Sequence, residues 1–210
     1  WGNDDDLQVT NTPTGNDFIQ VAAGWNHSVA VRNDGSLVSW GNDGDLQVTN
    51  TPAGNDFTQV AGGDGVSIAV RNDGSLVSWG NDDDLQVTNT PTGNDFTQVE
   101  AGQRHVIAVR NDGSLVSWGN DWENAVTNTP TGNGFIQVAA GFGHSVALKS
   151  DGSLVSWGDD NYLQVTNTPA GTHFIQVAAL GDYSIALRAP DGIKHLELPI
   201  RNWAFEGALP

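Results

Sequence analysis

Short apolar runs, separated by Gly, Asn and Asp, recur along the whole chain. In the first unit three such runs cover residues 18–23 (FIQVAA), 27–32 (HSVAVR) and 36–40 (SLVSW). Each run has five or six residues, is rich in β-branched and aromatic types, and lacks the i, i+3, i+4 spacing of an amphipathic helix. The NDG tripeptide at 33–35 favours a tight hairpin, because Asp-Gly supplies the positive φ angles of such turns. The pattern predicts a three-stranded antiparallel unit with minimal helix.

This unit repeats with a period of 39 residues, which tryptophan marks at Trp1, Trp40, Trp79, Trp118 and Trp157. DGSLVSWG occurs four times without change and VTNTP occurs five times. Apolar side chains fall on both faces of the strands, so each small sheet is expected to pack between two neighbours, as blades of a β-propeller do. The sequence predicts an all-β propeller of five blades, mostly three-stranded and antiparallel, over residues 1–192.

Closure of the ring is the open question of this architecture. In the fifth unit the residues at 189–192 replace the NDG hairpin, and SLVSWG does not follow. A ring needs its last blade completed, because an open sheet edge invites association. The segment 193–198 (IKHLEL) stands where the missing strand is expected, within a non-repeat tail of residues 193–210, and Trp1-Gly2 is the stub of a second closing strand. If these terminal segments do not close the ring, the chain is an arc of a larger propeller or an oligomer.

The repeated residues resemble those of a known family. The pattern A-A-G-x-x-H-S-x-A-[VL], followed by D-G-x-[LV]-x-x-W-G and a trailing Gln, is similar to the repeat of the regulator of chromosome condensation (RCC1) superfamily over residues 1 to about 192. The short period and three-strand blade resemble most the bacterial β-lactamase inhibitory protein II branch. The resemblance implies a propeller, usually of seven blades where this chain has five, and it does not by itself imply a function, since one fold hosts many.

Differences between the copies gather at one end of the units. The NDG hairpins hardly change, whereas the connection between the first and second strands reads WN, DG, QR, FG and GD in turn. Aromatic residues outside the repeat positions also fall in or beside the loops at this end. Exposed Trp and Tyr, with Arg, are typical anchors of protein interfaces, although surface loops also tolerate drift. The predicted binding residues are Trp25, Asn26, Asp64, Gln103, Arg104, Trp122, Glu123, Phe142, Tyr162, Asp182 and Tyr183.

The resemblance implies the same location, because the inhibitory branch holds its partners through aromatic and acidic residues of these loops. The distribution of acidic residues also favours these loops as the binding location. The chain carries 25 acidic and 8 basic residues, a net charge of −17. Fourteen of the acids fall in these loops, where Arg104 is the one basic residue. Such a face disfavours nucleic acid and favours a partner with a basic surface. No apolar stretch approaches the roughly 18 residues of a membrane span, so membrane insertion is not expected.

Few residues indicate catalysis or metal binding. Without Cys there is no disulfide, thiolate zinc site or cysteine nucleophile. His27, His105 and His144 recur at the start of the second strand, where hydrogen bonds between neighbouring units are the expected role. The Asp-rich loops offer oxygen ligands for Ca²⁺, but without EF-hand spacing. No cofactor or catalytic residue is predicted; a carboxylate pair of the glycosidase type is the remaining enzymatic alternative.

The sequence therefore favours a non-enzymatic scaffold that recognises a protein partner through an acidic loop face bearing aromatic residues. One alternative is a lectin-like propeller that binds carbohydrate. Another is the guanine-nucleotide exchange and chromatin role of the superfamily's namesake, which the acidic charge disfavours. A third is a structural spacer within a larger surface protein, and an extracellular or cell-surface setting is favoured.

Overall fold

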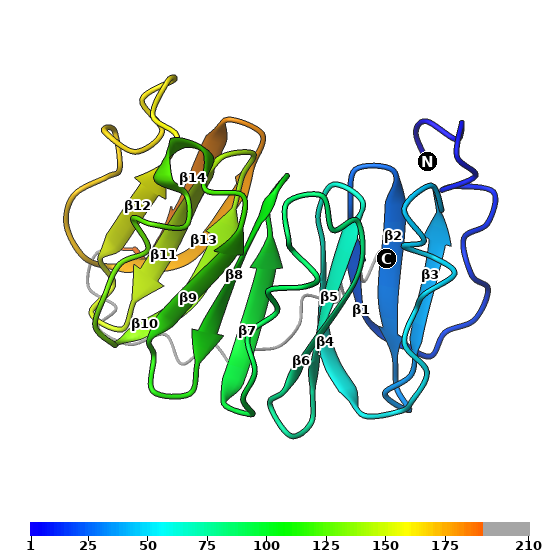
Figure 1. The fold of residues 1–210 in the computed structure, drawn as a ribbon. Coiled ribbons are helices and arrows are strands. Elements are labelled where there is room, and N and C mark those ends of the chain that lie inside the picture. The colour runs from blue at the N-terminus through cyan, green and yellow to red at the C-terminus, as the bar shows by residue number, and fades with distance from the viewer. Residues whose placement is uncertain (191–210) are drawn as a thin grey trace, which may run out of the picture.

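The computed structural model of the chain describes residues 1–190, which form five small antiparallel sheets. Figure 1 shows the sheets side by side, each with its strands in chain order. The strands are β1 (Phe18–Ala23), β2 (His27–Arg32) and β3 (Leu37–Gly41); β4 (Phe57–Gly62), β5 (Val66–Arg71) and β6 (Leu76–Gly80); β7 (Phe96–Ala101), β8 (His105–Arg110) and β9 (Leu115–Gly119); β10 (Phe135–Ala140), β11 (His144–Lys149) and β12 (Leu154–Gly158); and β13 (Phe174–Leu180) and β14 (Tyr183–Arg188). The prediction of five all-β propeller blades, mostly three-stranded, is confirmed.

Pairing within a blade separates two faces of the molecule. In the first blade His27 pairs with Gly41 and Val31 pairs with Leu37, so the NDG hairpin and the end of β3 lie at opposite ends of the sheet. The hairpins lie along the bottom of Figure 1, and the turns between the first and second strands lie along the top. We call upper face the surface formed by these turns and by the beginnings of the long segments that leave β3, β6, β9 and β12.

Helix is confined to one short 3-10 turn, η1 (Trp122–Asn124), among residues 1–190. No helix in this part of the chain is long and apolar enough to span a membrane.

The core lies between blades. Ile107 and Val109 of the third blade are buried against Phe135, Val138 and Trp157 of the fourth, and equivalent residues meet at the other three junctions. Trp79, Trp118 and Trp157 are therefore interface residues, whereas the cluster between the fourth and fifth blades contains no tryptophan among the described residues. The indole N–H of each of these three also donates a hydrogen bond to the segment between blades, as Trp157 does to the Ala125 carbonyl at 3.0 Å. Five sheets, four of them three-stranded, are thus joined by four apolar interfaces.

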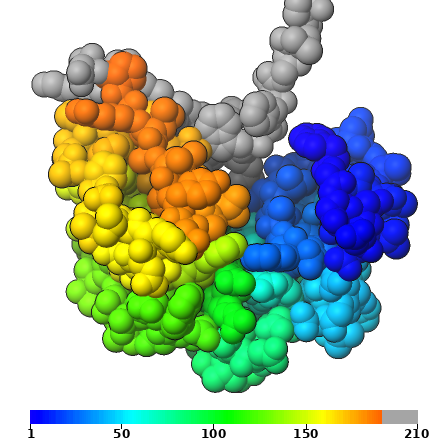
Figure 2. All heavy atoms as spheres, turned by 90° about the horizontal axis from the view of Figure 1, so that it is seen from above, coloured from blue at the N-terminus to red at the C-terminus, as the bar shows by residue number. Residues whose placement is uncertain are grey.

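The blades follow one another along an arc, with the first blade (blue) and the fifth (orange) at its two ends (Figure 2). The inner strands β1, β4, β7, β10 and β13 pack consecutively. Trp1 and Gly2 lie in no strand, and Trp1 is fully exposed, so this segment does not complete the fifth blade. The other expected closing strand, residues 193–198, and the tail to residue 210 lie outside the described residues.

Candidate functional site

The turns of the upper face are joined to one another by backbone hydrogen bonds. The Trp25 N–H donates to the Gly63 carbonyl at 3.1 Å, and the Gln103 N–H donates to the Gly141 carbonyl at 3.3 Å. The Phe142 N–H donates to the carbonyl of the fifth blade's turn at 2.8 Å. Because each bond crosses from one blade to the next, the variable side chains project from a connected rim.

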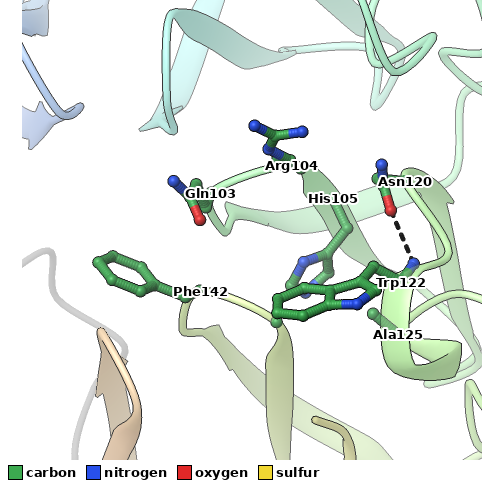
Figure 3. A pocket seen from close by; sticks show the side chains of 8 residues that line it. Gln103, Arg104, His105, Asn120, Trp122, Ala125 and Phe142 are labelled. Atoms are coloured by element: carbon green, nitrogen blue, oxygen red, sulfur yellow. Dashed lines mark hydrogen bonds between the residues drawn. The ribbon is translucent and has the colours of Figure 1, made fainter.

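A pocket of about 430 Å³ opens on this face between the third and fourth blades. Figure 3 shows the rings of Phe142 and Trp122 on two sides, with Gln103 and Arg104 projecting from the turn between β7 and β8. Its lining residues are Gln103, Arg104, His105, Asn120, Trp122, Ala125, Phe142 and Gly143. The pocket therefore combines aromatic walls with amide and guanidinium donors.

Trp122 is fixed at its backbone while its ring stays 57% exposed. The Asn120 side-chain oxygen accepts a hydrogen bond from the Trp122 N–H at 2.7 Å. The ring packs over Gly143, where a Cβ would lie in ordinary contact with the indole at 3.5 Å and more tightly against the Asp159 Cβ at 3.2 Å. A held backbone with an exposed ring is the arrangement of a preorganised anchor.

Phe142 also joins the pocket to the opposite part of the upper face. Its ring stacks on Trp25 of the first blade, with ring centroids 5.3 Å apart and planes inclined by 27°. The two residues come from non-adjacent blades, so this contact bridges across the face. Three aromatic side chains are thus brought together on this face: Trp122 and Phe142 line the pocket, and the exposed Trp25 stacks on Phe142.

Polar side chains around the pocket are weakly engaged. The Arg104 guanidinium lies 3.8 Å from an Asp84 carboxylate oxygen and is 60% exposed. Gln103 donates a long hydrogen bond of 3.4 Å to Asp64 of the preceding blade. Exposed ion pairs of this kind contribute little to stability, so these groups remain able to exchange partners.

Many loop carboxylates hold the loops themselves. Asp43 accepts hydrogen bonds from the backbone N–H groups of Val48 and Thr49 at 2.9 and 2.8 Å, and from the Thr49 hydroxyl. The Thr49 bonds lower the pKa of Asp43. The same arrangement recurs at Asp4, Asp82, Asp121 and Asp160. Across residues 1–190, no three His, Cys, Asp or Glu side chains are grouped to hold a metal ion, so the calcium alternative gains no support.

The recurrent histidines tie blades together, as expected. Nε2 of His27, His105 and His144 lies 2.8 Å from a serine hydroxyl of the following blade. Burial lowers the pKa of His27 and of His105 to about 4, so both rings are neutral at pH 7. Between the second and third blades the pair is apolar. Val66 replaces the histidine, Val106 replaces the serine, and both are fully buried in one cluster.

The structure brings together only part of the predicted binding set. One pocket is lined by Gln103, Arg104, Trp122 and Phe142. Trp25 stacks on Phe142, and Asp64 accepts a hydrogen bond from Gln103. The predicted residues that do not line the pocket are Asn26, Glu123, Tyr162, Asp182 and Tyr183. Of these, Tyr183 is the first residue of β14 and is exposed at the open side of the fifth blade.

Four lining residues were not in the predicted set: His105, Asn120, Ala125 and Gly143. Divergence between copies gave no signal for His105 and Asn120, because similar residues stand in most copies. For Ala125 and Gly143 the sequence did carry a signal. Ala125 replaces the Gln of the other four copies, and Gly143 lies in a variable turn.

Comparison with known proteins agrees with this architecture. The family model "Regulator of chromosome condensation (RCC1) repeat" matches residues 18–47, 96–121 and 135–164. No curated protein matches the chain.

Solved structures share the fold at low sequence identity. Human WBSCR16 superposes with a TM-score of 0.67 at 18% identity, over 81% of this chain and 59% of that one. The ectodomain of the receptor kinase CR4 from Physcomitrella patens superposes with a TM-score of 0.71 at 19% identity, over 81% of this chain and 50% of that one. Prp20p from Saccharomyces cerevisiae superposes with a TM-score of 0.71 at 21% identity, over 86% of this chain and 58% of that one.

The chain thus spans between half and three fifths of the length of these three proteins. The finer likeness to the β-lactamase inhibitory protein II branch stays a prediction. The blade structure and the structural neighbours show a β-propeller, and three segments of the chain match the RCC1 repeat.

Proposed function

We propose that the chain is a non-enzymatic scaffold that binds a protein partner on its upper face, with the pocket between Trp122 and Phe142 as the anchor site. The observation that carries the proposal is a pocket lined by the rings of Trp122 and Phe142, with Trp25 stacked on Phe142. Trp and Tyr held in place beside an Arg dominate the energetics of many protein interfaces. A pocket of about 430 Å³ is large enough to take side chains of a partner.

The ring of Trp122 has no counterpart in the other copies, which favours a single partner over one sugar site per blade. In the other four copies the position of Trp122 is held by Asp5, Gly44, Asp83 and Asn161. A lectin with a site in every blade would need a similar ring in every copy. The aromatic residues instead come from different turns of the first, third and fourth blades and form one composite surface.

Charge supports a partner with a basic surface. The chain has a net charge of −17, and the loops of the upper face carry most of its acidic side chains. A field of one sign accelerates encounter with an oppositely charged protein and weakens with salt. Protein partners are also named for structural neighbours: Prp20p is described with its binding to Gsp1p and histones, and yeast RCC1 is described bound to Kap60.

The test compares the wild-type chain with a Trp122→Ala, Phe142→Ala double variant. Proteins retained by the immobilised chain are identified, and each purified candidate is titrated against both forms. We expect the double variant to bind at least about 30-fold more weakly, since two anchor residues are worth 2 kcal/mol or more. Ile136→Ala, which truncates an exposed side chain on β10 outside the pocket, serves as the control and should bind as wild type.

Equal binding by the double variant and wild type would refute the assignment of this face. The association rate should also fall as the salt concentration rises from about 50 to about 300 mM, because screening shortens the range of the acidic field. If a glycan array rather than a protein shows Trp122-dependent binding, the lectin-like alternative replaces the protein-binding one.

A further inference from the structure

The first three blade junctions share one set of contacts, and the fourth repeats it without the tryptophan. We call following face the side of a blade turned toward the next blade, and preceding face the side turned toward the one before. On the following face two apolar residues of the second strand, such as Val29 and Val31, are fully buried. They meet a Phe, a Val and a Trp on the preceding face of the next blade, such as Phe57, Val60 and Trp79.

Polar groups at the junction are also paired across it. The Gln20 side chain donates to the Val60 carbonyl at 3.3 Å and accepts from the Val60 N–H at 2.9 Å. The same exchange joins Gln59 to Val99, and it recurs at the two later junctions. Together with the histidine–serine pairs, these bonds give each junction a defined register.

The two end blades each leave one half of this junction exposed. Val21 of the first blade is 67% exposed, whereas its counterparts Val60, Val99, Val138 and Val177 are at most 3% exposed. On the fifth blade Ile185 and Leu187 are 64% and 51% exposed, whereas their counterparts in the first four blades are at most 3% exposed. Figure 2 shows these blades at the two ends of the arc.

The two exposed halves match each other. The fifth blade presents Gln176 at the position of the bridging glutamine, and the first blade presents the backbone of Val21 at the position that such a glutamine binds. Tyr183 stands at the histidine position and Ser28 at the serine position. A phenol hydroxyl can donate to a serine oxygen as an imidazole N–H does.

We propose that the following face of the fifth blade binds the preceding face of the first blade of a second copy of this chain. The contact is heterologous, so it generates either a closed ring of two or more copies or an open series of copies. The first and fifth blades lie at the two ends of the arc, and their end faces carry the exposed Val21, Ile185 and Leu187 (Figure 2). This inference does not depend on the proposed function of the upper face.

Salt separates this association from binding at the upper face. Each copy carries a charge of −17, so two copies repel, while the contact itself is apolar. Screening should therefore strengthen self-association as salt rises, which is opposite to the effect expected for a basic partner.

Sedimentation velocity of the 210-residue chain tests the proposal. We expect wild type to sediment above its monomer mass of 22.2 kDa, with a larger share of assembled protein at higher concentration and higher salt. Val21→Glu and Ile185→Glu each place a charge on one of the two faces, and each alone should sediment as a monomer. Both side chains are exposed in the single chain, so both variants should melt at the temperature of wild type at dilutions where it is a monomer.

A mixture of the two variants is the decisive measurement. Val21→Glu keeps an intact fifth blade and Ile185→Glu keeps an intact first blade, so together they should form a one-to-one dimer and nothing larger. Ile136→Glu makes a comparable change at an exposed position away from both end faces and should assemble as wild type.

A monomeric wild-type chain at all concentrations and salts would overturn the proposal. So would unchanged assembly of both single variants, which would place the contact elsewhere. If wild type is monomeric and a chain ending at Pro190 assembles, residues 191–210 occupy one of the faces and the second-copy assignment is wrong.

Discussion

Glu100 places an ionisable group at a junction where the other blades have alanine. It lies on β7, and the equivalent residues are Ala22, Ala61, Ala139 and Ala178. The equivalent Ala22 packs against residues of the second blade, so the same position of the third blade faces the fourth. Burial there raises the pKa of the Glu100 carboxyl from its ordinary value of 4.5 to about 7, and a 3.3 Å hydrogen bond from the neighbouring Gln98 amide only partly offsets this.

The direction of the pH effect follows from this raised pKa. A carboxyl that keeps its proton longer in the folded chain favours folding while protonated, so its contribution is lost as pH rises from about 4.5 to about 7. At 1.36 kcal/mol per pKa unit, ionised Glu100 destabilises the fold by about 3 kcal/mol at pH 8. Between pH 5 and pH 8 the change in the free energy of unfolding is about 2.5 kcal/mol.

Glu100→Gln removes the charge and keeps the shape. Urea unfolding followed by tryptophan fluorescence, at pH values from about 5 to about 8, gives the free energy of unfolding of each form. As pH rises across this range, the free energy of unfolding of the variant should increase relative to that of wild type by about 2.5 kcal/mol. Taking the difference between the two proteins cancels the opposite contribution of the buried histidines.

The exposed Glu123→Gln controls for the change in net charge and should give a curve parallel to wild type. Parallel curves for Glu100→Gln and wild type would refute the reasoning, because they would mean that Glu100 ionises in the folded chain as easily as in the unfolded one.

Three further predictions concern stability. Ser145→Ala should lower the free energy of unfolding by about 1 to 2 kcal/mol, because it leaves the buried His105 ring without its partner, whereas Ser28→Ala, for which the structure shows no preceding histidine, should have little effect; urea unfolding compares them. Leu85→Asn should raise the melting temperature, since Leu85 holds a left-handed φ of 62° while half exposed and Asn tolerates that region better; a lower melting temperature would contradict this. Stability should also fall as pH drops from 6.5 toward about 4, because the unfolded chain protonates the His105 side chain before the folded chain does, and His105→Gln should flatten this slope.

Local chemistry explains how much of this molecule could be predicted from its sequence. Strands at 18–23 and 27–32 agree with β1 and β2 because alternating β-branched residues and an Asp-Gly turn act over a few neighbouring residues. The 39-residue period determined the blade count, and the direction of the strands determined which loops share a face. These features were accessible because they depend on residues close together in the chain.

Side-chain contacts between blades were not accessible in the same way. Nothing in the sequence indicates that Trp25 stacks on Phe142, since the two belong to blades that are not neighbours. Asn120 was missed as a pocket residue because Asn stands at the same position in most copies, and only its position beside Trp122 makes it part of the site.

Val21 and Val60 show most clearly what the sequence determines and what depends on the tertiary structure. They occupy the same position in nearly identical repeats, FIQVAA and FTQVAG, and the sequence alone assigns both to a strand with an apolar face. Val60 is 2% exposed and Val21 is 67% exposed. The sequence by itself determined the blade and its repetition. Which copy is buried and which is exposed was decided by the tertiary structure, because burial depends on the neighbouring blade that packs against each face.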